Sequence, residues 1–203
     1  MARALSVSPN PAKVGDELEV TGTGFGAAAT LTTALTGSNN DLKYTAVDAG
    51  TDGNAVSVTY ADPGGASAAL SVTVSGSDIT VHLGRAASAI NSTGALVLAA
   101  IQGSVAASAL VTVANAPGND GSGLVTALSK TTLSGGTVET VDLQIMNLPG
   151  GVEVNEQVVA SSADASLSTT DTYEISQAGV VHVKAFVSDV LVASEDIEVF
   201  TLS

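Results

Sequence analysis

The feature that most limits the fold of this 203-residue chain is a short alternation of apolar and polar residues, repeatedly interrupted by turn residues. Leu5 and Val7 alternate with serines, and Leu18 and Val20 alternate with acidic residues and a threonine. A period of two residues is the pattern of a β-strand with one buried face. Gly, Pro, Asn and Asp between such runs indicate turns. The sequence therefore predicts a mainly β protein.

The same pattern continues along most of the chain, and one segment departs from it. After Ser92 or Thr93, either of which can cap a helix through its side-chain oxygen, Leu96, Val97 and Ile101 share one helical face. We expect the two runs within 69–83, separated by Ser-Gly-Ser-Asp, to form a hairpin. The other expected strands are 5–7, 17–21, 29–36, 42–47, 55–60, 110–113, 124–128, 138–146, 152–159, 172–175, 180–187 and 190–200.

The order of these elements predicts a discontinuous domain. Residues 1–36 contain two or three strands, too few for independent stability, whereas residues 137–203 contain about five. Together they have the size of an immunoglobulin-like β-sandwich. Residues 37–136 combine strands with the helix and are predicted to form an inserted α+β domain, because insertions are tolerated at exposed loops. The alternative is three consecutive units, the first of which would be small.

Charge is sparse and strongly acidic. The chain has 20 acidic and 6 basic residues and a net charge of −14, and the last 67 residues contribute eleven acids against one cation, Lys184. One interpretation is a solvated surface that protects edge strands from aggregation, and the other is a face that docks on a basic partner. The shortage of Lys and Arg argues against nucleic-acid binding. The absence of Cys excludes disulfides, thiolate catalysis and Cys-ligated metal sites.

Histidine is the first candidate for catalytic chemistry. His82 and His182 are the only two, and each lies within a strand pattern, where a solvent-facing position is the ordinary interpretation. Lys184 shares a strand face with His182. Ser and Asp are abundant, so composition alone does not exclude a Ser-His-Asp triad, but the chain has no Gly-x-Ser-x-Gly nucleophile motif.

Three further segments superficially resemble ligand-binding loops. Asp48 with Asp52–Asn54, and separately Asn119–Gly121, look like fragments of calcium loops but lack the alternating acids and distal Glu. Turn formation explains them more simply. Gly22–Gly26 lacks the spacing of a dinucleotide-binding loop, and we expect its Phe25 to pack at the edge of the sandwich. We therefore predict no catalytic, cofactor-binding or metal-binding residues.

The N-terminal sequence and the hydropathy of the chain also bear on localisation. Polar residues alternate with apolar ones from Ser6, and Pro9 interrupts the run, so the start of the chain does not match the apolar core of a signal peptide. No stretch approaches the roughly 20 apolar residues of a membrane-spanning helix. We expect a protein that is made and kept in the cytoplasm, or assembled there, without membrane contact.

Two stretches resemble bacterial and phage Ig-like domains. Residues 6–16, SVSPNPAKVGD, leading into LEVTGTGF at 18–25, resemble the first strands of such domains. Residues 177–185, QAGVVHVKA, resemble a late strand, with Val181 where the corner tyrosine usually stands. The resemblance implies an Ig-like sandwich without the cysteines of antibody domains.

The central part of the chain resembles a module found in structural proteins of tailed bacteriophages. The likeness covers about half the chain and implies settings such as capsid decoration, tail and fibre proteins, with no catalytic residues to transfer. The segments that carry it are 40–46, 50–58, 60–64, 70–81, the helix after 90–93 and the loop 118–123.

These observations lead to a functional expectation. We predict a non-enzymatic virion protein that decorates and stabilises the outer surface of a tailed-phage head, assembled in the host cytoplasm. Its expected partners are the major capsid protein and further copies of itself, as a homotrimer or as lattice neighbours. The alternatives are a phage tail protein, of the tube or the fibre base, a bacterial surface adhesin, and, least favoured, an enzyme.

Overall fold

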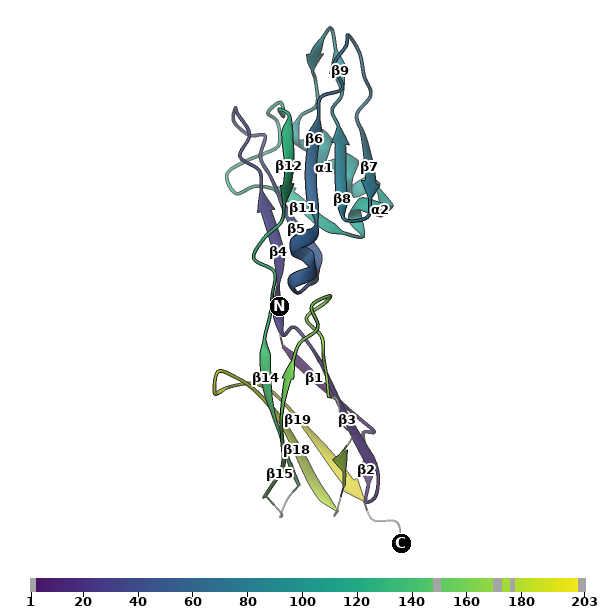
Figure 1. The fold of residues 1–203 in the computed structure, drawn as a ribbon, viewed down its shortest axis with the longest axis vertical. Coiled ribbons are helices and arrows are strands. Elements are labelled where there is room, and N and C mark those ends of the chain that lie inside the picture. Colours follow the sequence, from purple (N-terminus) through teal and green to yellow (C-terminus); the bar gives the residue numbers. More distant parts are fainter. Residues whose placement is uncertain (1–2, 148–150, 170–172, 176–177, 201–203) are drawn as a thin grey trace. The chain divides into compact units, whose positions relative to one another are not determined.

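The protein is mainly β and divides into two compact units in a computed structural model (Figure 1). The structure describes residues 3–147, 151–169, 173–175 and 178–200. Unit 1 comprises residues 1–27 together with 137–203, and unit 2 comprises residues 28–136. The first boundary lies nine residues before the predicted one at residue 36, and the second, between 136 and 137, is where it was predicted.

Unit 1 contains two sheets whose arrangement is consistent with a β-sandwich. In the first sheet, the central strand β3 (Glu17–Thr23) pairs with β1 (Ala4–Ser8), β16 (Leu167–Ser168) and β17 (Tyr173–Glu174). The second sheet has the order β15-β14-β18-β19-β2, and its neighbours are antiparallel except for β19 and β2. The bounds of its strands are β15 Gly151–Val159, β14 Thr140–Asn147, β18 Gly179–Val187, β19 Val190–Phe200 and β2 Ala12–Lys13.

Alternation along the strands builds the core of unit 1. In β18, Val181, Val183 and Ala185 are buried, whereas His182 and Lys184 are half-buried on the opposite face. Both sheets contribute buried side chains to one cluster. From the first sheet and its flanks come Val7, Leu18, Val20, Phe25 and Leu167, and from the second Val141, Leu143, Ile145, Val181, Val183, Ile197 and Val199.

Phe25 corrects one expectation. We predicted it at the sandwich edge, but its side chain is fully buried in the core of unit 1. Gly22 makes room for the ring, because a Cβ added at Gly22 would lie 2.7 Å from Cε2 of Phe25. The glycine-rich segment thus serves packing.

Unit 2 has one four-stranded sheet, most of a second, a small hairpin and two α-helices. The strand orders are β11-β5-β4-β13 and β12-β6-β8-β7, and β6 and β8 run parallel. Strand β4 continues from unit 1 into unit 2, and β13, which pairs with its start, belongs to unit 1. The bounds are β4 Gly26–Thr32, β5 Leu42–Ala49, the 3-10 helix η1 Thr51–Ala55, β6 Ser57–Ala61, β7 Ser71–Ser75, β8 Asp78–His82, β9 Arg85–Ala86, β10 Ala89–Ile90, α1 Gly94–Gly103, α2 Val105–Ser108, β11 Val111–Asn115, β12 Leu128–Thr132 and β13 Thr137–Val138.

The core of unit 2 joins its sheets to helix α1. Val97 and Ile101 of α1 are fully buried in the same cluster as the strand residues. Two tyrosines lie at its centre, where the hydroxyl oxygens of Tyr44 and Tyr60 are 2.6 Å apart. Burial raises the pKa of both phenols well above the ordinary value.

Two strand predictions in unit 2 are wrong, each for a local reason. The expected strand 29–36 ends at Thr32, because Asp41 Oδ1 accepts hydrogen bonds from Thr33 Oγ1 (3.1 Å) and Leu35 N (2.7 Å). The expected strand 124–128 is replaced by an isolated bridge between Leu124 and Thr93, and β12 begins only at Leu128. In the first case a carboxylate, and in the second the start of helix α1, binds backbone groups that would otherwise pair with a neighbouring strand.

Candidate functional site

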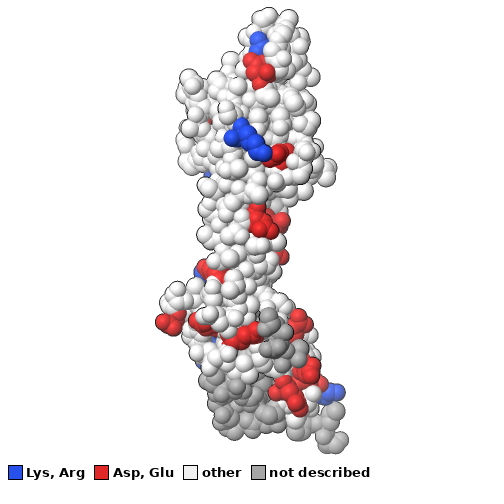
Figure 2. Space-filling model, viewed as in Figure 1, with Lys and Arg blue, Asp and Glu red and all other residues white. Residues whose placement is uncertain are grey.

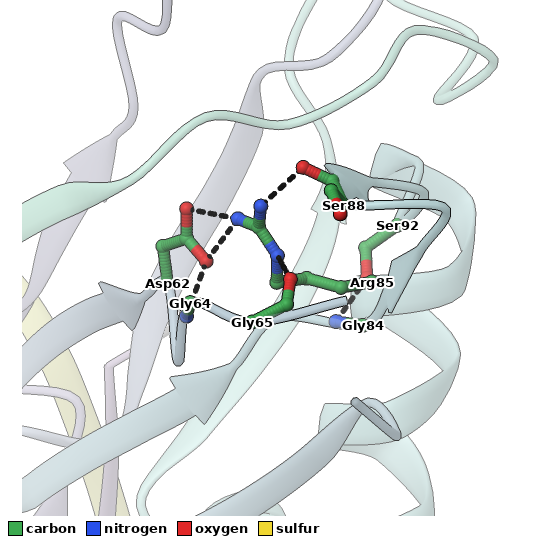
Figure 3. A network of polar contacts seen from close by, with 7 residues as sticks. All are labelled: Asp62, Gly64, Gly65, Gly84, Arg85, Ser88 and Ser92. Atoms are coloured by element: carbon green, nitrogen blue, oxygen red, sulfur yellow. Dashed lines mark hydrogen bonds and ion pairs between the residues drawn. The ribbon is translucent and has the colours of Figure 1, made fainter. Parts of the chain in front are cut away.

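A polar network centred on Arg85 is the most elaborate cluster of side-chain contacts in the described residues, and we take it as the candidate functional site (Figure 3). We call it the Arg85 network. It joins the loop that follows β6 to the segment that follows β8. Its members are Asp62, Gly64, Gly65, Gly84, Arg85, Ser88 and Ser92.

The guanidinium of Arg85 contacts three different chain segments. Nη1 donates to both carboxylate oxygens of Asp62, at 2.6 and 2.5 Å. Nε donates to the carbonyl of Gly65 at 2.9 Å, and Nη2 donates to the carbonyl of Ser88. Only 13% of the Arg85 side chain is exposed. A planar group with five donors can hold several acceptors at once, which suits it to fixing loops.

The local sequence explains how these loops reach the arginine. Gly64 and Gly65 have φ angles of 69° and 78°, which glycine adopts without strain. Asp62 Oδ1 also accepts the N–H of Gly64 at 2.9 Å, which closes an Asx turn. Ala68 and Arg85 exchange both backbone hydrogen bonds, which fixes the loop against β9.

Gly84 and Ser92 form the second half of the network. The N–H of Gly84 donates to Ser92 Oγ at 2.8 Å, and Ser92 is 1% exposed. A Cβ at Gly84 would lie 2.9 Å from Asn91 Oδ1, so only glycine fits without a shift. Because Ser92 is used here, Thr93 caps helix α1 by accepting the N–H of Leu96 at 3.3 Å.

The electrostatics of the network are those of a stable ion pair. The N–H of Gly64 and then the guanidinium of Arg85 hold the pKa of Asp62 below its usual value. Asp62 stays ionised at neutral pH, and both of its carboxylate oxygens are engaged. The arrangement can hold two loops in one conformation, and it offers no side chain poised for proton transfer or nucleophilic attack.

The two histidines are not brought together. His82 Nε2 lies 3.1 Å from Thr73 Oγ1 on the neighbouring strand of unit 2. His182 Nδ1 lies 2.5 Å from Asp196 Oδ1 across the β18–β19 pair in unit 1. Both side chains are half-buried, and neither contact includes a serine. Each histidine takes part in a cross-strand polar pair.

The segments that resembled calcium loops form internal contacts. Asn54 and Gly136 exchange two hydrogen bonds, of 3.0 and 2.9 Å, between the amide side chain and the backbone. Asn119 Oδ1 accepts the N–H of Asp41 at 3.1 Å, and Asp120 Oδ1 accepts the N–H of Ser122 at 2.9 Å. No group of three or more His, Cys, Asp or Glu that could hold a metal occurs in the part of the chain that the structure describes.

The N-terminus of helix α1 is capped by the chain itself. The N–H groups of Gly94 and Ala95 donate to the carbonyls of Gly123 (3.0 Å) and Gly121 (2.8 Å). Asn40, 1% exposed, donates through Nδ2 to the carbonyls of Thr36 (2.9 Å) and Leu124 (2.8 Å), which ties two loops together. These contacts occupy the donors that an anion would need.

The Arg85 network was not predicted from the sequence. Residues 60–64 were given only as one of the segments that resemble phage modules, and Arg85 was not singled out. A lone arginine three residues after a strand histidine, with no acid near it in the sequence, carries no pattern from which a partner 23 residues away can be found. The available signal for an ordered turn was the sequence Asp62-Pro63-Gly64-Gly65, whose two glycines adopt positive φ in the structure.

Acidic side chains gather on the surface of unit 1 (Figure 2). The outer face of the second sheet carries a groove of about 450 Å³ among strands β14, β15 and β18. It is lined by Asp142, Gln144, Asn155, Glu156, Gln157, Phe186 and Asp189. We call it the acidic groove.

No protein family, curated protein or solved structure matches the chain. Helices of the described residues are too short or too polar to cross a membrane.

Proposed function

We propose that the protein is a non-enzymatic structural component of a tailed-phage virion, which decorates the outer surface of the head and stabilises it. The observation that carries the proposal is the strand order of unit 1, together with the place of unit 2 in the chain, between β3 and β14. This order fits the Ig-like resemblance of residues 6–25 and 177–185, and unit 2 contains the segments that resemble phage modules.

The Ig-like identity of unit 1 is part of the proposal. An Ig-like sandwich has a sheet with strands A, B and E facing a sheet with strands C, F and G, to which C′ can be added. Strands β1, β3 and β17 take the places of A, B and E, and β14, β18 and β19 take those of C, F and G, with β15 as C′. Unit 2 then stands as a domain inserted between B and C.

Binding by repetition is the proposed mechanism. Many copies on a regular lattice multiply modest contacts, because each additional attachment point raises the effective concentration of the others. The major capsid protein is the proposed partner, with neighbouring copies of the chain as further contacts at symmetry-related positions. The Arg85 network supports this role, since loops held in one conformation lose little entropy when a partner binds them.

Mass spectrometry of purified particles tests the proposal. Virions are separated into heads and tails, and the copy number of the protein is measured against the major capsid protein in each fraction. Decoration predicts copies in the hundreds on heads. Detection in tails alone would reject decoration and favour a tail component, and absence from both fractions would reject a virion role.

A further inference from the structure

The acidic groove on unit 1 combines carboxylates, amides and one aromatic ring on adjacent strands. Asp142 on β14 stands opposite Phe186 on β18 and opposite Gln157 on β15. Gln144, two residues further along β14, stands opposite Asn155. A cross-strand arrangement of this kind places the side chains on one face, within reach of a single ligand.

The turn between β18 and β19 adds a further carboxylate. Ser188 and Asp189 form it, with φ angles of 50° and 63°. Asp189 lines the groove together with Phe186. Glu156 also lines it and accepts a hydrogen bond from the hydroxyl of Tyr173. Three acidic residues therefore line the groove: Asp142, Glu156 and Asp189.

Within the described residues, no Lys, Arg or His forms an ion pair with Asp142 or Asp189. Asp142 accepts one hydrogen bond, from Gln157 Nε2 at 2.9 Å. The groove-lining residues include no Lys or Arg, and Lys184, on the same strand as Phe186, stands opposite Gln144 without lining the groove. Among the described residues, the ion pairs are Arg3–Glu139, Arg85–Asp62, Lys130–Asp78 and His182–Asp196.

An aromatic ring, that of Phe186, also lines the acidic groove. Of the three Phe and three Tyr in the chain, Phe25, Tyr44 and Tyr60 are fully buried, and Phe200 is 52% exposed at the end of β19. Phe186 is instead half-buried beside carboxylates in a groove. Aromatic residues, Phe among them, are enriched in protein–protein interfaces, and a ring face attracts a cation.

We propose that the acidic groove binds an arginine side chain presented by a basic segment of the partner protein. The carboxylates of Asp142 and Asp189 supply charge, and the amide oxygens of Gln144 and Asn155 add acceptors for the planar, five-donor guanidinium. The ring of Phe186 supplies a face for it to stack on. The inference deepens the proposed function, on which it rests for the identity of the partner, because it names the chemistry of the surface that unit 1 docks on.

Nuclear magnetic resonance with the full chain tests the groove directly. The probe is the peptide acetyl-Arg-Ala-Arg-amide, with the citrulline peptide of the same length as the uncharged comparison and the lysine peptide as the test of guanidinium preference. We expect the amide signals of Asp142, Phe186 and Asp189 to shift with the arginine peptide, less with the lysine peptide, and not with the citrulline peptide. Shifts that avoid the groove, or equal shifts with all three peptides, would overturn the inference.

Matched variants measure the contribution of the two carboxylates. Asp142→Asn with Asp189→Asn removes two charges in the groove, and Glu19→Gln with Glu198→Gln removes two from exposed positions of unit 1 outside it. The groove variant should bind the arginine peptide roughly tenfold more weakly, as expected for two exposed charge pairs, and the control should lose little. Equal losses in both variants would show attraction by net charge alone and overturn the site.

Co-sedimentation with purified heads separates this inference from the proposed function. If the wild type and the control variant bind heads and the groove variant binds at least several-fold more weakly, both are supported. If all three bind equally, the groove is not the docking site while decoration stands. If none binds heads, decoration fails, and the peptide titration alone decides whether the groove binds arginine.

Discussion

The two units differ in how many of their acidic residues can pair with a cation of the same unit. Unit 2 has six acids and three cations, and two of the cations, Arg85 and Lys130, form ion pairs with its own acids, Asp62 and Asp78. Unit 1 has fourteen acids and three cations, so most of its carboxylates have no cation within the unit to pair with. Two of the three cations of unit 2 pair with acids of that unit, whereas in unit 1 the acids outnumber the cations by fourteen to three. We therefore expect the units to differ in which substitutions and conditions unfold them, and in what they bind.

Separate expression of the units is the change with the largest expected effect. Ala27 and Thr137 are cross-strand partners, so a two-residue Asn-Gly turn should join 1–27 to 137–203 as a hairpin. We expect this joined chain and residues 28–136 to fold independently and cooperatively, because each has its own buried core. Circular dichroism and thermal melts provide the measurement. An unfolded joined chain beside a folded 137–203 would contradict the discontinuous unit.

The next largest effect is expected from adding a single methyl group in unit 2, which should destabilise that unit alone. A Cβ at Gly123 would lie 2.0 Å from the carbonyl oxygen of Ser38, so Gly123→Ala forces two backbone segments apart. We expect the free energy of unfolding of unit 2 to fall by about 3 kcal/mol, with unit 1 unchanged. Gly103→Ala is the control, because nothing lies within 4 Å of its added Cβ, and it should stabilise helix α1 by about 0.5–1 kcal/mol. Denaturant titration followed by unit-specific resonances distinguishes the two, and equal effects of the two substitutions would refute the packing argument.

Alkaline pH should also distinguish the units. Burial raises the folded-state pKa of Tyr44 and Tyr60, so the unfolded chain loses these protons first, near pH 10. The stabilisation is complete below that pH and is lost as the pH rises above it, by up to about 1.4 kcal/mol per pH unit for each tyrosine. We expect the melting temperature of residues 28–136 to fall steeply above pH 10. The double variant Tyr44→Phe with Tyr60→Phe should flatten this dependence, and an unchanged profile in that variant would assign the loss to other groups.

The smallest expected effect is local and concerns the Arg85 network. Arg85→Lys keeps the charge but cannot bond Asp62, Gly65 and Ser88 together, because an ammonium lacks the planar fork. We expect roughly tenfold faster amide exchange in the loops 62–68 and 85–91, with the rest of unit 2 unaffected. Lys130→Gln breaks an exposed ion pair with Asp78 and should leave exchange near the wild-type rate. Wild-type protection in Arg85→Lys would show that the arginine does not hold the loops.

Local signals in the sequence were enough for much of the secondary structure. The hairpin β7–β8, helix α1 and strand β19 follow from turn residues, a cap and alternation within a few positions. The mainly β fold class is confirmed in the same way. Strand β17 lies within the predicted run 172–175, but the short strand β16 was not predicted, because it depends on pairing with β3, which lies more than 140 residues earlier in the chain.

The site was less predictable than the fold, for a physical reason. The Arg85 network and the acidic groove assemble from residues whose separation in sequence exceeds any local pattern: Asp62 with Arg85, and Asp142 with Asp189. The register of β14 against β18 decides that Asp142 stands opposite Phe186, and a shift of β18 by one residue would turn Phe186 to the other face. Composition could indicate only that unit 1 is acidic.

Electron cryomicroscopy of heads with and without the protein tests the central claim most directly. The proposal predicts added density at regular positions on the outer surface of heads that contain the protein. That density should accommodate both units, with the acidic groove of unit 1 against a basic surface of the capsid. Identical outer surfaces in the two preparations, or added density confined to the tail, would contradict it.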